Sequence, residues 1–223
     1  MNRLEIAASI HWIEGINGNC YLLADKDITL IDTGLPHNAK KILGYISELH
    51  RAPTDLKLIV LTHYHIDHIG NAEELRKITG AKIAAHKEDA EYISGKKAAP
   101  VPKEAMRIVK SAGGFTKVEP FQVDLVLNDG DKVAGLAVIH APGHTPGSIA
   151  LYDSKRKILF SGDTLRYSGG KVEGPPEQFT MNPERVHQSI EKLKSLDFDT
   201  MLGGHGEPLK TGASAMVREY TGT

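Results

Sequence analysis

The sequence predicts a mixed α/β protein in which two β-sheets stack face to face and helices cover their outer faces. Short apolar runs rich in Ile, Val and Leu recur along the 223 residues, separated by turn residues and by amphipathic segments. Both halves of the chain contain strands as well as helices, and each such element must bury its apolar face against another layer. The length suits one domain, which we expect to span residues 1–223.

The first half of the chain is predicted to form one sheet with its helices. Apolar runs bounded by turn residues predict strands over 4–13, 19–24, 28–31, 58–61 and 83–85. Helices are expected over 36–49, from Asp67 or Asn71 to Gly80, and in a short segment around Tyr92. Pro36 suits the first turn of its helix, and Gly80 suits a helix end.

The second half is predicted to repeat this arrangement. A hairpin is expected between 122–127 and 132–139, with the turn at 128–131, and another between 149–152 and 157–160. A helix over 183–196 would bury Val186, Ile190 and Leu193, a last strand would cover 199–202, and a short helix would follow Thr211. Two remaining segments, 94–120 and 166–182, are expected to be surface connections that flank the active site.

The strand ends of the two halves resemble each other. An Asp-Thr pair follows an apolar strand at Asp32 and again at Asp163, and histidines follow the strands at 59–63 and 138–144. We therefore expect two similar halves that face each other.

Composition excludes several classes of function. Lys and Arg together number 27 and Asp and Glu 28, so no bulk positive field is available to bind nucleic acid. Cys20 is the single cysteine, which rules out an intramolecular disulfide. No apolar run reaches the length of a membrane span, and the N-terminal residues do not predict a signal peptide. We expect a cytoplasmic protein, with a homodimer as the default state.

Three histidines and an aspartate lie within six residues, from His63 to His68, directly after the apolar strand at 58–61. Such groups are costly to bury unless they are paired or bind a metal, and imidazole and carboxylate are ligands of zinc and related ions. Because alternate residues of an extended segment point the same way, His63 and His65 can hold one ion together. Asp67 and His68 point elsewhere and suit a second ion.

Further candidate ligands lie at later strand ends, each with a glycine close by. They are His144, Asp163 and His205. We interpret His86, His140 and His187 as residues that are not ligands.

With these residues in this order, the chain resembles the metallo-β-lactamase-fold hydrolase superfamily, and in particular its small stand-alone glyoxalase II-like and lactonase-like members. The resemblance implies a four-layer αββα sandwich with the site at one edge, between the sheets. It implies that His63, His65 and His144 hold a first ion, that Asp67, His68 and His205 hold a second, that Asp163 bridges them, and that Asp32 orients the ligand loops. Two divalent ions are expected, zinc above all, with iron and manganese as alternatives.

The function expected on this basis is hydrolysis of a small ester, thioester or lactone by a hydroxide that bridges the two ions. Asp67 is the candidate proton acceptor. Tyr167 is a candidate substrate contact, by similarity to lactonases of this fold; the alternative is that Tyr167 packs on the sheet edge. The aspartate at position 163 argues against zinc β-lactamases that place a cysteine in the site, and residues 206–223 are too few for the C-terminal helical domain of glyoxalase II.

Three other functions are considered beside hydrolysis of a small carbonyl compound. A mononuclear iron persulfide dioxygenase of the same fold would not use the residues matching Asp67 and His205 as ligands, and both are present. A phosphodiesterase is a second alternative. A non-enzymatic binding module would be expected to lack a ligand, and none is missing from this chain.

Overall fold

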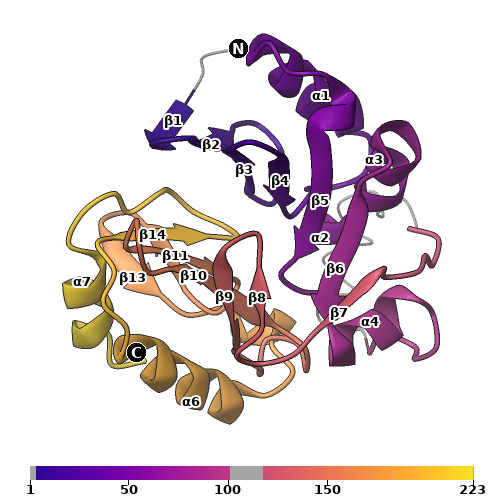
Figure 1. The fold of residues 1–223 in the computed structure, drawn as a ribbon. Helices are drawn as coiled ribbons and strands as arrows, with labels where there is room; N and C mark the ends of the chain where they lie inside the picture. Colours follow the sequence, from indigo (N-terminus) through magenta and orange to yellow (C-terminus); the bar gives the residue numbers. More distant parts are fainter. Residues whose placement is uncertain (1–3, 101–117, 223) are drawn as a thin grey trace.

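The computed structural model describes residues 4–100 and 118–222, so residues 101–117 of the predicted 94–120 connection lie outside the described residues. Two sheets face each other, and helices cover the outer face of each (Figure 1). This is the predicted four-layer αββα arrangement. No helix among the described residues combines the length and the apolar character needed to cross a membrane.

The first sheet has seven strands in chain order. They are β1 (Leu4–Ala7), β2 (Ile10–Ile13), β3 (Cys20–Ala24), β4 (Ile28–Ile31), β5 (Leu56–Leu61), β6 (Lys82–His86) and β7 (Leu125–Leu127). Strands β1 to β4 are antiparallel, whereas β4 to β7 run parallel. The helices beside this sheet are α1 (Ala39–Glu48), α2 (Ile66–Ile69), α3 (Ala72–Thr79) and α4 (Lys87–Ile93), with a 3₁₀ turn, η1, at Pro53–Asp55.

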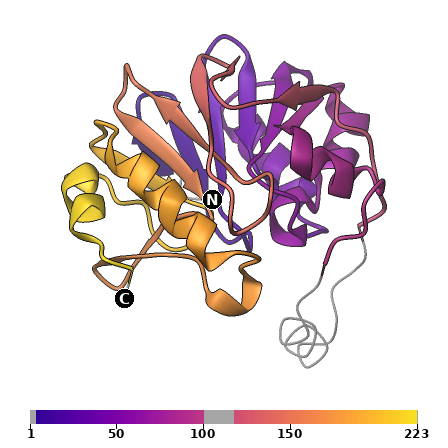
Figure 2. The same cartoon turned by 90° about the horizontal axis from the view of Figure 1, so that it is seen from below.

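The second sheet has five strands in the order β14-β11-β10-β9-β8. They are β8 (Lys132–Val133), β9 (Leu136–His140), β10 (Ile149–Asp153), β11 (Ile158–Gly162) and β14 (Thr200–Gly203). Helices α6 (Pro183–Lys194) and α7 (Ala213–Glu219) lie on the side opposite the helices of the first half (Figure 2). A small hairpin of β12 (Arg166–Ser168) and β13 (Lys171–Glu173), followed by the 3₁₀ turn η2 (Glu177–Phe179), precedes α6.

Alternation along the strands builds three apolar layers. In β5, Ile59 and Leu61 pack toward α1 and α3, whereas Val60 between them faces the other sheet. In β11, Phe160 faces the first sheet and Leu159 packs toward α6. Successive strand residues point to opposite faces, so each central strand serves two layers and the two sheets are held at a fixed separation.

Each half of the chain contains the same kind of crossover connection between two parallel strands. Strand β4 leads through α1 to the parallel strand β5, and β11 leads through α6 to the parallel strand β14. Asp32 and Asp163 follow the first strand of each pair, and His63 and His205 follow the second. The topology therefore makes His205 the counterpart of His63, while His144 leaves an antiparallel strand.

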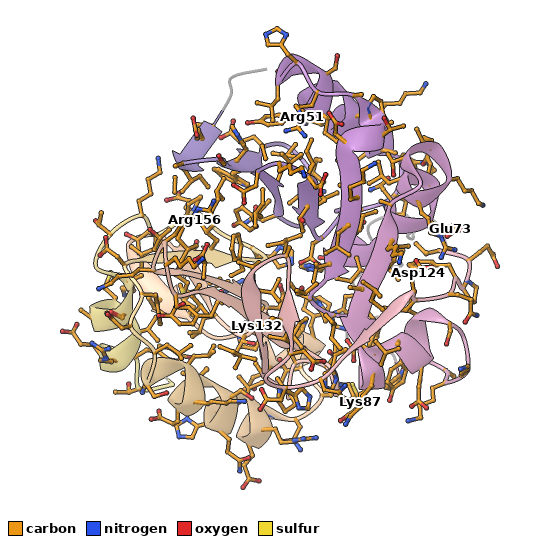
Figure 3. The ribbon with its side chains drawn as sticks, in the orientation of Figure 1. Arg51, Glu73, Lys87, Asp124, Lys132 and Arg156 are labelled. Atoms are coloured by element: carbon orange, nitrogen blue, oxygen red, sulfur yellow. The ribbon has the colours of Figure 1, made fainter. Side chains whose placement is uncertain are left out.

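The halves are also joined at the opposite ends of these strands. Arg156 lies in the β10–β11 turn and is labelled in Figure 3. Its guanidinium contacts the carboxylate of Asp25 at 2.8 Å and that of Asp153 at 2.9 Å. Arg51 donates to the backbone carbonyl of Asp25. The side chains of both arginines are partly exposed. These contacts therefore add little to the free energy of unfolding and serve to fix the positions of the turns that they join.

Three sequence predictions were wrong. The segment 4–13 is two antiparallel strands, because Ser9 takes a left-handed φ of 62° and turns the chain. The predicted hairpin across 128–131 does not exist: β7 joins the first sheet, and β8 pairs with β9 in the second. The segment 166–182 contains the β12–β13 hairpin and is not only a loop.

The helix predicted from residue 36 begins at Ala39, after His37 takes a φ of 72°. The Asn71 side chain, expected as a candidate cap of its own helix, accepts hydrogen bonds from the backbone of Asn38 and Ala39 instead. It thereby caps α1 and ties this helix to the segment that follows His68.

Replacing Phe160 by alanine should destabilise the protein by about 3–5 kcal/mol, because this ring is 1% exposed between the sheets and meets Tyr21 edge to face. Urea denaturation followed by circular dichroism measures the change. Val126→Ala, at a side chain 56% exposed on β7, is the control and should shift stability by less than about 0.5 kcal/mol. Equal losses in the two variants would contradict the assignment of the inter-sheet core.

Candidate metal centre

Seven predicted ligand residues meet at one edge of the sandwich. They come from the turn after β5 (His63, His65), from α2 (Asp67, His68), from the turn after β9 (His144), from directly after β11 (Asp163) and from the turn after β14 (His205). Local spacing brings the first four together. Only the packing of the two sheets brings in the other three.

One group of nitrogens converges between the sheets. His63 Nε2 lies 3.1 Å from His65 Nδ1, and His144 Nε2 lies 2.9 Å from the same atom. His63 and His144 are buried, while His65 is partly exposed. These three imidazole nitrogens lie too close together for another side chain to come between them. Three imidazole ligands and one free position are typical of an open, catalytic zinc site.

A second group lies beside the first. His205 Nε2 is 3.1 Å from Asp67 Oδ2, and His68 Nε2 is 3.8 Å from the same oxygen. These three side chains form a further set with the separation expected of metal ligands.

Asp163 lies between the two groups. Its Oδ2 atom is 3.3 Å from His144 Nε2 and 3.4 Å from His205 Nε2, while its Oδ1 atom is 3.4 Å from His68 Nε2. A single carboxylate therefore faces nitrogens of both groups.

Asp32 orients two of the histidines. Its Oδ2 atom accepts from His68 Nδ1 at 2.9 Å and from the Thr62 hydroxyl at 2.7 Å, and its Oδ1 atom accepts from the Thr62 amide. Because the Thr62 hydroxyl donates to Asp32, its lone pair is free to accept from His63 Nδ1, 3.1 Å away. Both rings thus carry a proton on Nδ1 and turn Nε2 toward the site, as outer partners of metal ligands do.

The turn that carries His205 is held from the first sheet. Asn19 donates through its side-chain amide to the carbonyls of Gly203 and Gly206, and the Tyr21 hydroxyl donates to Gly203. Gly204 has no room for a side chain, because a Cβ atom there would lie 2.2 Å from Asp163 Oδ1. The sequence shows the glycines, but nothing in it connects Asn19 to this turn.

The two groups differ in charge. Burial, together with the neighbouring histidines, holds the pKa of His63 and of His144 well below the usual value, and burial lowers the pKa of His65 to about 4. For His68, burial opposes protonation, but the carboxylates of Asp163, Asp32 and Asp67 outweigh it and raise the pKa to about 10. The first group therefore offers neutral imidazoles, whereas the second is a cation–carboxylate cluster in which a metal ion would replace protons.

The residues fit a divalent metal. His68 Nε2 and Asp163 Oδ1 are buried without a hydrogen-bond partner among the described residues, although such atoms are normally paired. Both point into the space that the other ligand candidates surround. A metal ion with nitrogen and oxygen ligands would satisfy them.

Tyr167 lies in β12, beside the turn of His205. Its backbone carbonyl accepts from the Glu207 amide at 2.8 Å, and its partly buried ring packs against the apolar layer under α6 and α7. The structure thus places Tyr167 next to the turn that carries one candidate ligand.

A fourth set of close side chains lies outside the predicted site: His86, Glu88 and His140. The rings of His86 and His140 stack with centroids 4.0 Å apart and planes within 18°. Nearly parallel rings point their nitrogen lone pairs in parallel rather than toward one point, which disfavours a shared ion. His140 Nε2 instead donates to the Pro146 carbonyl at 2.9 Å.

Comparison with known proteins agrees with this geometry. The model of the metallo-beta-lactamase superfamily matches residues 13–205, from β2 to the last candidate ligand. The chain belongs to the metallo-beta-lactamase superfamily. It is a metal-dependent hydrolase by this classification.

Individual members of the superfamily match most of the chain. Hydroxyacylglutathione hydrolase GloC of Haemophilus influenzae is 30% identical, over 84% of this chain and 85% of its own length. Probable metallo-hydrolase YflN of Bacillus subtilis is 28% identical, over 92% of this chain and 86% of its own length. The crystal structure of the class B3 di-zinc metallo-beta-lactamase LRA-12, from an Alaskan soil metagenome, superposes with a TM-score of 0.74 at 23% identity, covering 98% of this chain and 89% of that one. This last likeness shows the shared fold.

Replacing His86 by glutamine should make the metal-free protein less sensitive to acid. Burial and the neighbouring His140 and Lys87 lower the pKa of His86 to about 4, while an unfolded histidine titrates near pH 6.5. The unfolded state therefore binds more protons between about pH 6.5 and 4, and stability falls as the pH falls through this window. Urea unfolding at pH 7.5 and pH 5 should show a loss smaller by on the order of 1 kcal/mol in the variant. An identical loss in both proteins would contradict the burial of a neutral His86.

Proposed function

We propose that the chain is a dinuclear metal-dependent hydrolase of a small ester, thioester or lactone, and that a thioester is the preferred substrate. His63, His65 and His144 would hold one ion, Asp67, His68 and His205 the other, and Asp163 would bridge them. Zinc is the expected metal. The observation that carries this proposal is the position of Asp163, whose two oxygens face nitrogens of both groups within 3.3–3.4 Å.

When bound, two neighbouring divalent ions lower the pKa of a shared water toward neutrality and polarise the substrate carbonyl. The chain supplies the geometry for this chemistry. Asp32 keeps His63 and His68 in the tautomer that presents Nε2 to the site. The low pKa of His65 keeps its ring neutral and available as a ligand at physiological pH.

Asp67 is our candidate for the proton acceptor. Its side chain is 28% exposed and that of His205 39%, whereas Asp163 is 8% exposed. The site is therefore open to solvent on the side of Asp67 and His205, and this is the side from which we expect water and substrate to enter. The charges of His68 and His205 outweigh burial and hold the pKa of Asp67 below its usual value, which keeps it ionised.

The preference for a thioester rests on relatives. The protein from Haemophilus influenzae is named as a hydroxyacylglutathione hydrolase, and its similarity to this chain extends over most of both sequences. Tyr167 remains a predicted substrate contact, because β12 lies next to the turn of His205. The alternative is a packing role, which the contact of its ring with the apolar layer under α6 and α7 supports. A Tyr167→Phe variant that raises KM for the substrate would support this role.

His63→Ala and Asp163→Ala should abolish hydrolysis and lower the bound metal, because the first removes a ligand and the second the group shared by both ions. Inductively coupled plasma mass spectrometry and a thioester assay measure the two effects. His187→Ala, at an exposed position on α6, is the matched control and should change neither. His140 is a weaker control, since it contacts the backbone of the His144 turn. Full activity in Asp163→Ala would contradict the proposal.

Elemental analysis joined to a substrate panel tests the reaction class. The protein as purified and after zinc loading should contain two metal equivalents per chain and hydrolyse a thioester faster than a lactone, an ester or a phosphodiester. Chelation should remove this activity, and zinc should restore it. One iron per chain with oxygen uptake in the presence of a persulfide would overturn the proposal in favour of a dioxygenase. Metal without turnover on any substrate would favour a binding module.

A further inference from the structure

Asp89 is a buried carboxylate that the proposed mechanism does not use. It lies in the first turn of α4, with no solvent exposure. Its Oδ2 atom accepts from the Tyr64 amide at 2.9 Å and from the Thr145 hydroxyl at 2.7 Å, and its Oδ1 atom accepts from the Gly147 amide at 2.6 Å. Its three partners therefore come from two different turns, one after β5 and one after β9.

These partners adjoin every member of the first ligand group. Tyr64 lies between His63 and His65 in the chain, and Thr145 directly follows His144. The Nε2 atoms of His63 and His144 lie 3.1 and 2.9 Å from the same atom, His65 Nδ1. Their separation depends on the two turns keeping a fixed distance, and the Asp89 carboxylate is bonded to both.

We infer that Asp89 is a positioning residue for the first metal ion, which it serves by locking the turn of His63 and His65 to the turn of His144. This inference rests on the proposed function, because it assumes that these three histidines bind metal. It is distinct from the role of Asp32, whose carboxylate contacts Thr62 and His68. Asp32 thus acts on one histidine of each group, whereas Asp89 joins the two turns that carry the first group.

The site of Asp89 is built for a carboxylate. Two of its partners are backbone amides, which can only donate, and the third donates a hydroxyl proton. An asparagine at this position would turn its own NH₂ group toward at least one of these donors. The backbones of Gly147 and Asp89 lie so close together that a Cβ atom on Gly147 would be 2.5 Å from the backbone nitrogen of Asp89. The asparagine side chain therefore has no space in which to turn away from the Gly147 amide. One of the two turns must then move, and ligand sites tolerate little displacement.

The turn of His144 is also held from the side of α6, where the Ser189 hydroxyl donates to the Pro142 carbonyl and the amides of Met181 and Asn182 donate to the carbonyls of His144 and Gly143. At the start of β10, the Ile149 amide donates to the Thr62 carbonyl. Asp89 alone reaches from α4 to this connection by a side-chain hydrogen bond within residues 4–100 and 118–222. Burial raises the pKa of the Asp89 carboxyl to about 7, so binding should be measured at pH 8, where the ionised form is present.

Cobalt titration of the metal-free protein tests this inference. Cobalt(II) reports its coordination geometry through its d–d absorption bands, and a competing chelator gives the affinity of each binding phase. Wild type should show two phases, one of which is absent in His65→Ala and so belongs to the first group. Asp89→Asn should weaken this phase by about 10- to 100-fold, the range typical of outer partners of metal ligands, and should shift its bands while leaving the other phase unchanged.

Asp153→Asn is the matched control. Asp153 is also a buried aspartate that accepts from two backbone amides, at Lys155 and Arg156, but it lies at the opposite end of β10. This variant should keep both phases. Unchanged affinity and bands in Asp89→Asn would overturn the inference, as would an equal loss in Asp153→Asn. Absence of cobalt binding in wild type would instead overturn the proposed function.

A second variant covers the case in which Asp89→Asn does not fold. Thr145→Val removes the hydroxyl that donates to Asp89, together with its contact to Ser148, and keeps the shape of the side chain. It should shift the bands of the first phase in the same direction, with a smaller loss of affinity. Bands identical to those of wild type would overturn the inference.

Discussion

Seven ionisable side chains converge on one edge of the sandwich, and the surrounding structure has to hold them there. Isolated charges and imidazoles are costly to bury, yet His63, His68 and His144 are buried and Asp163 is nearly so. The carboxylates and imidazolium groups offset part of this cost by pairing with each other. Three buried atoms of these side chains, His68 Nε2, His144 Nδ1 and Asp163 Oδ1, still have no hydrogen-bond partner among the described residues. The arrangement is explained best by ions that complete it.

Residues around the site must hold its ligand candidates in place, because these side chains repel one another or remove water from one another. Separate polar residues hold each turn: Asp32 the His63–His68 segment, Asn19 and Tyr21 the turn of His205, and Asp89 the turn of His144. These contacts cross between the sheets or between a helix and a turn, so they keep their lengths only if the layers do not slide. The apolar layer around Phe160 and Val60 supplies that rigidity. Core packing and metal chemistry are linked in this way.

Much of the fold and of the candidate site could be predicted from the sequence, and the failures share a physical cause. The cluster from His63 to His68 is local, so its period of two along an extended segment shows which side chains point together. The prediction of a hairpin across 128–131 was wrong, because the alternation of apolar and polar residues identifies a strand but does not show which sheet the strand joins. Asp89 was not predicted, since its partners are 25, 56 and 58 residues away and no local pattern marks it. The ligand set itself stays a prediction that the geometry supports.

Anomalous X-ray scattering at the zinc edge, from crystals of the zinc-loaded protein, locates the ions without reference to activity and so decides whether the site is dinuclear. We expect two peaks, one among the nitrogens of His63, His65 and His144 and one among Asp67, His68 and His205, with Asp163 in contact with both. A single peak, or a peak between His86 and His140 in place of either, would contradict the dinuclear site.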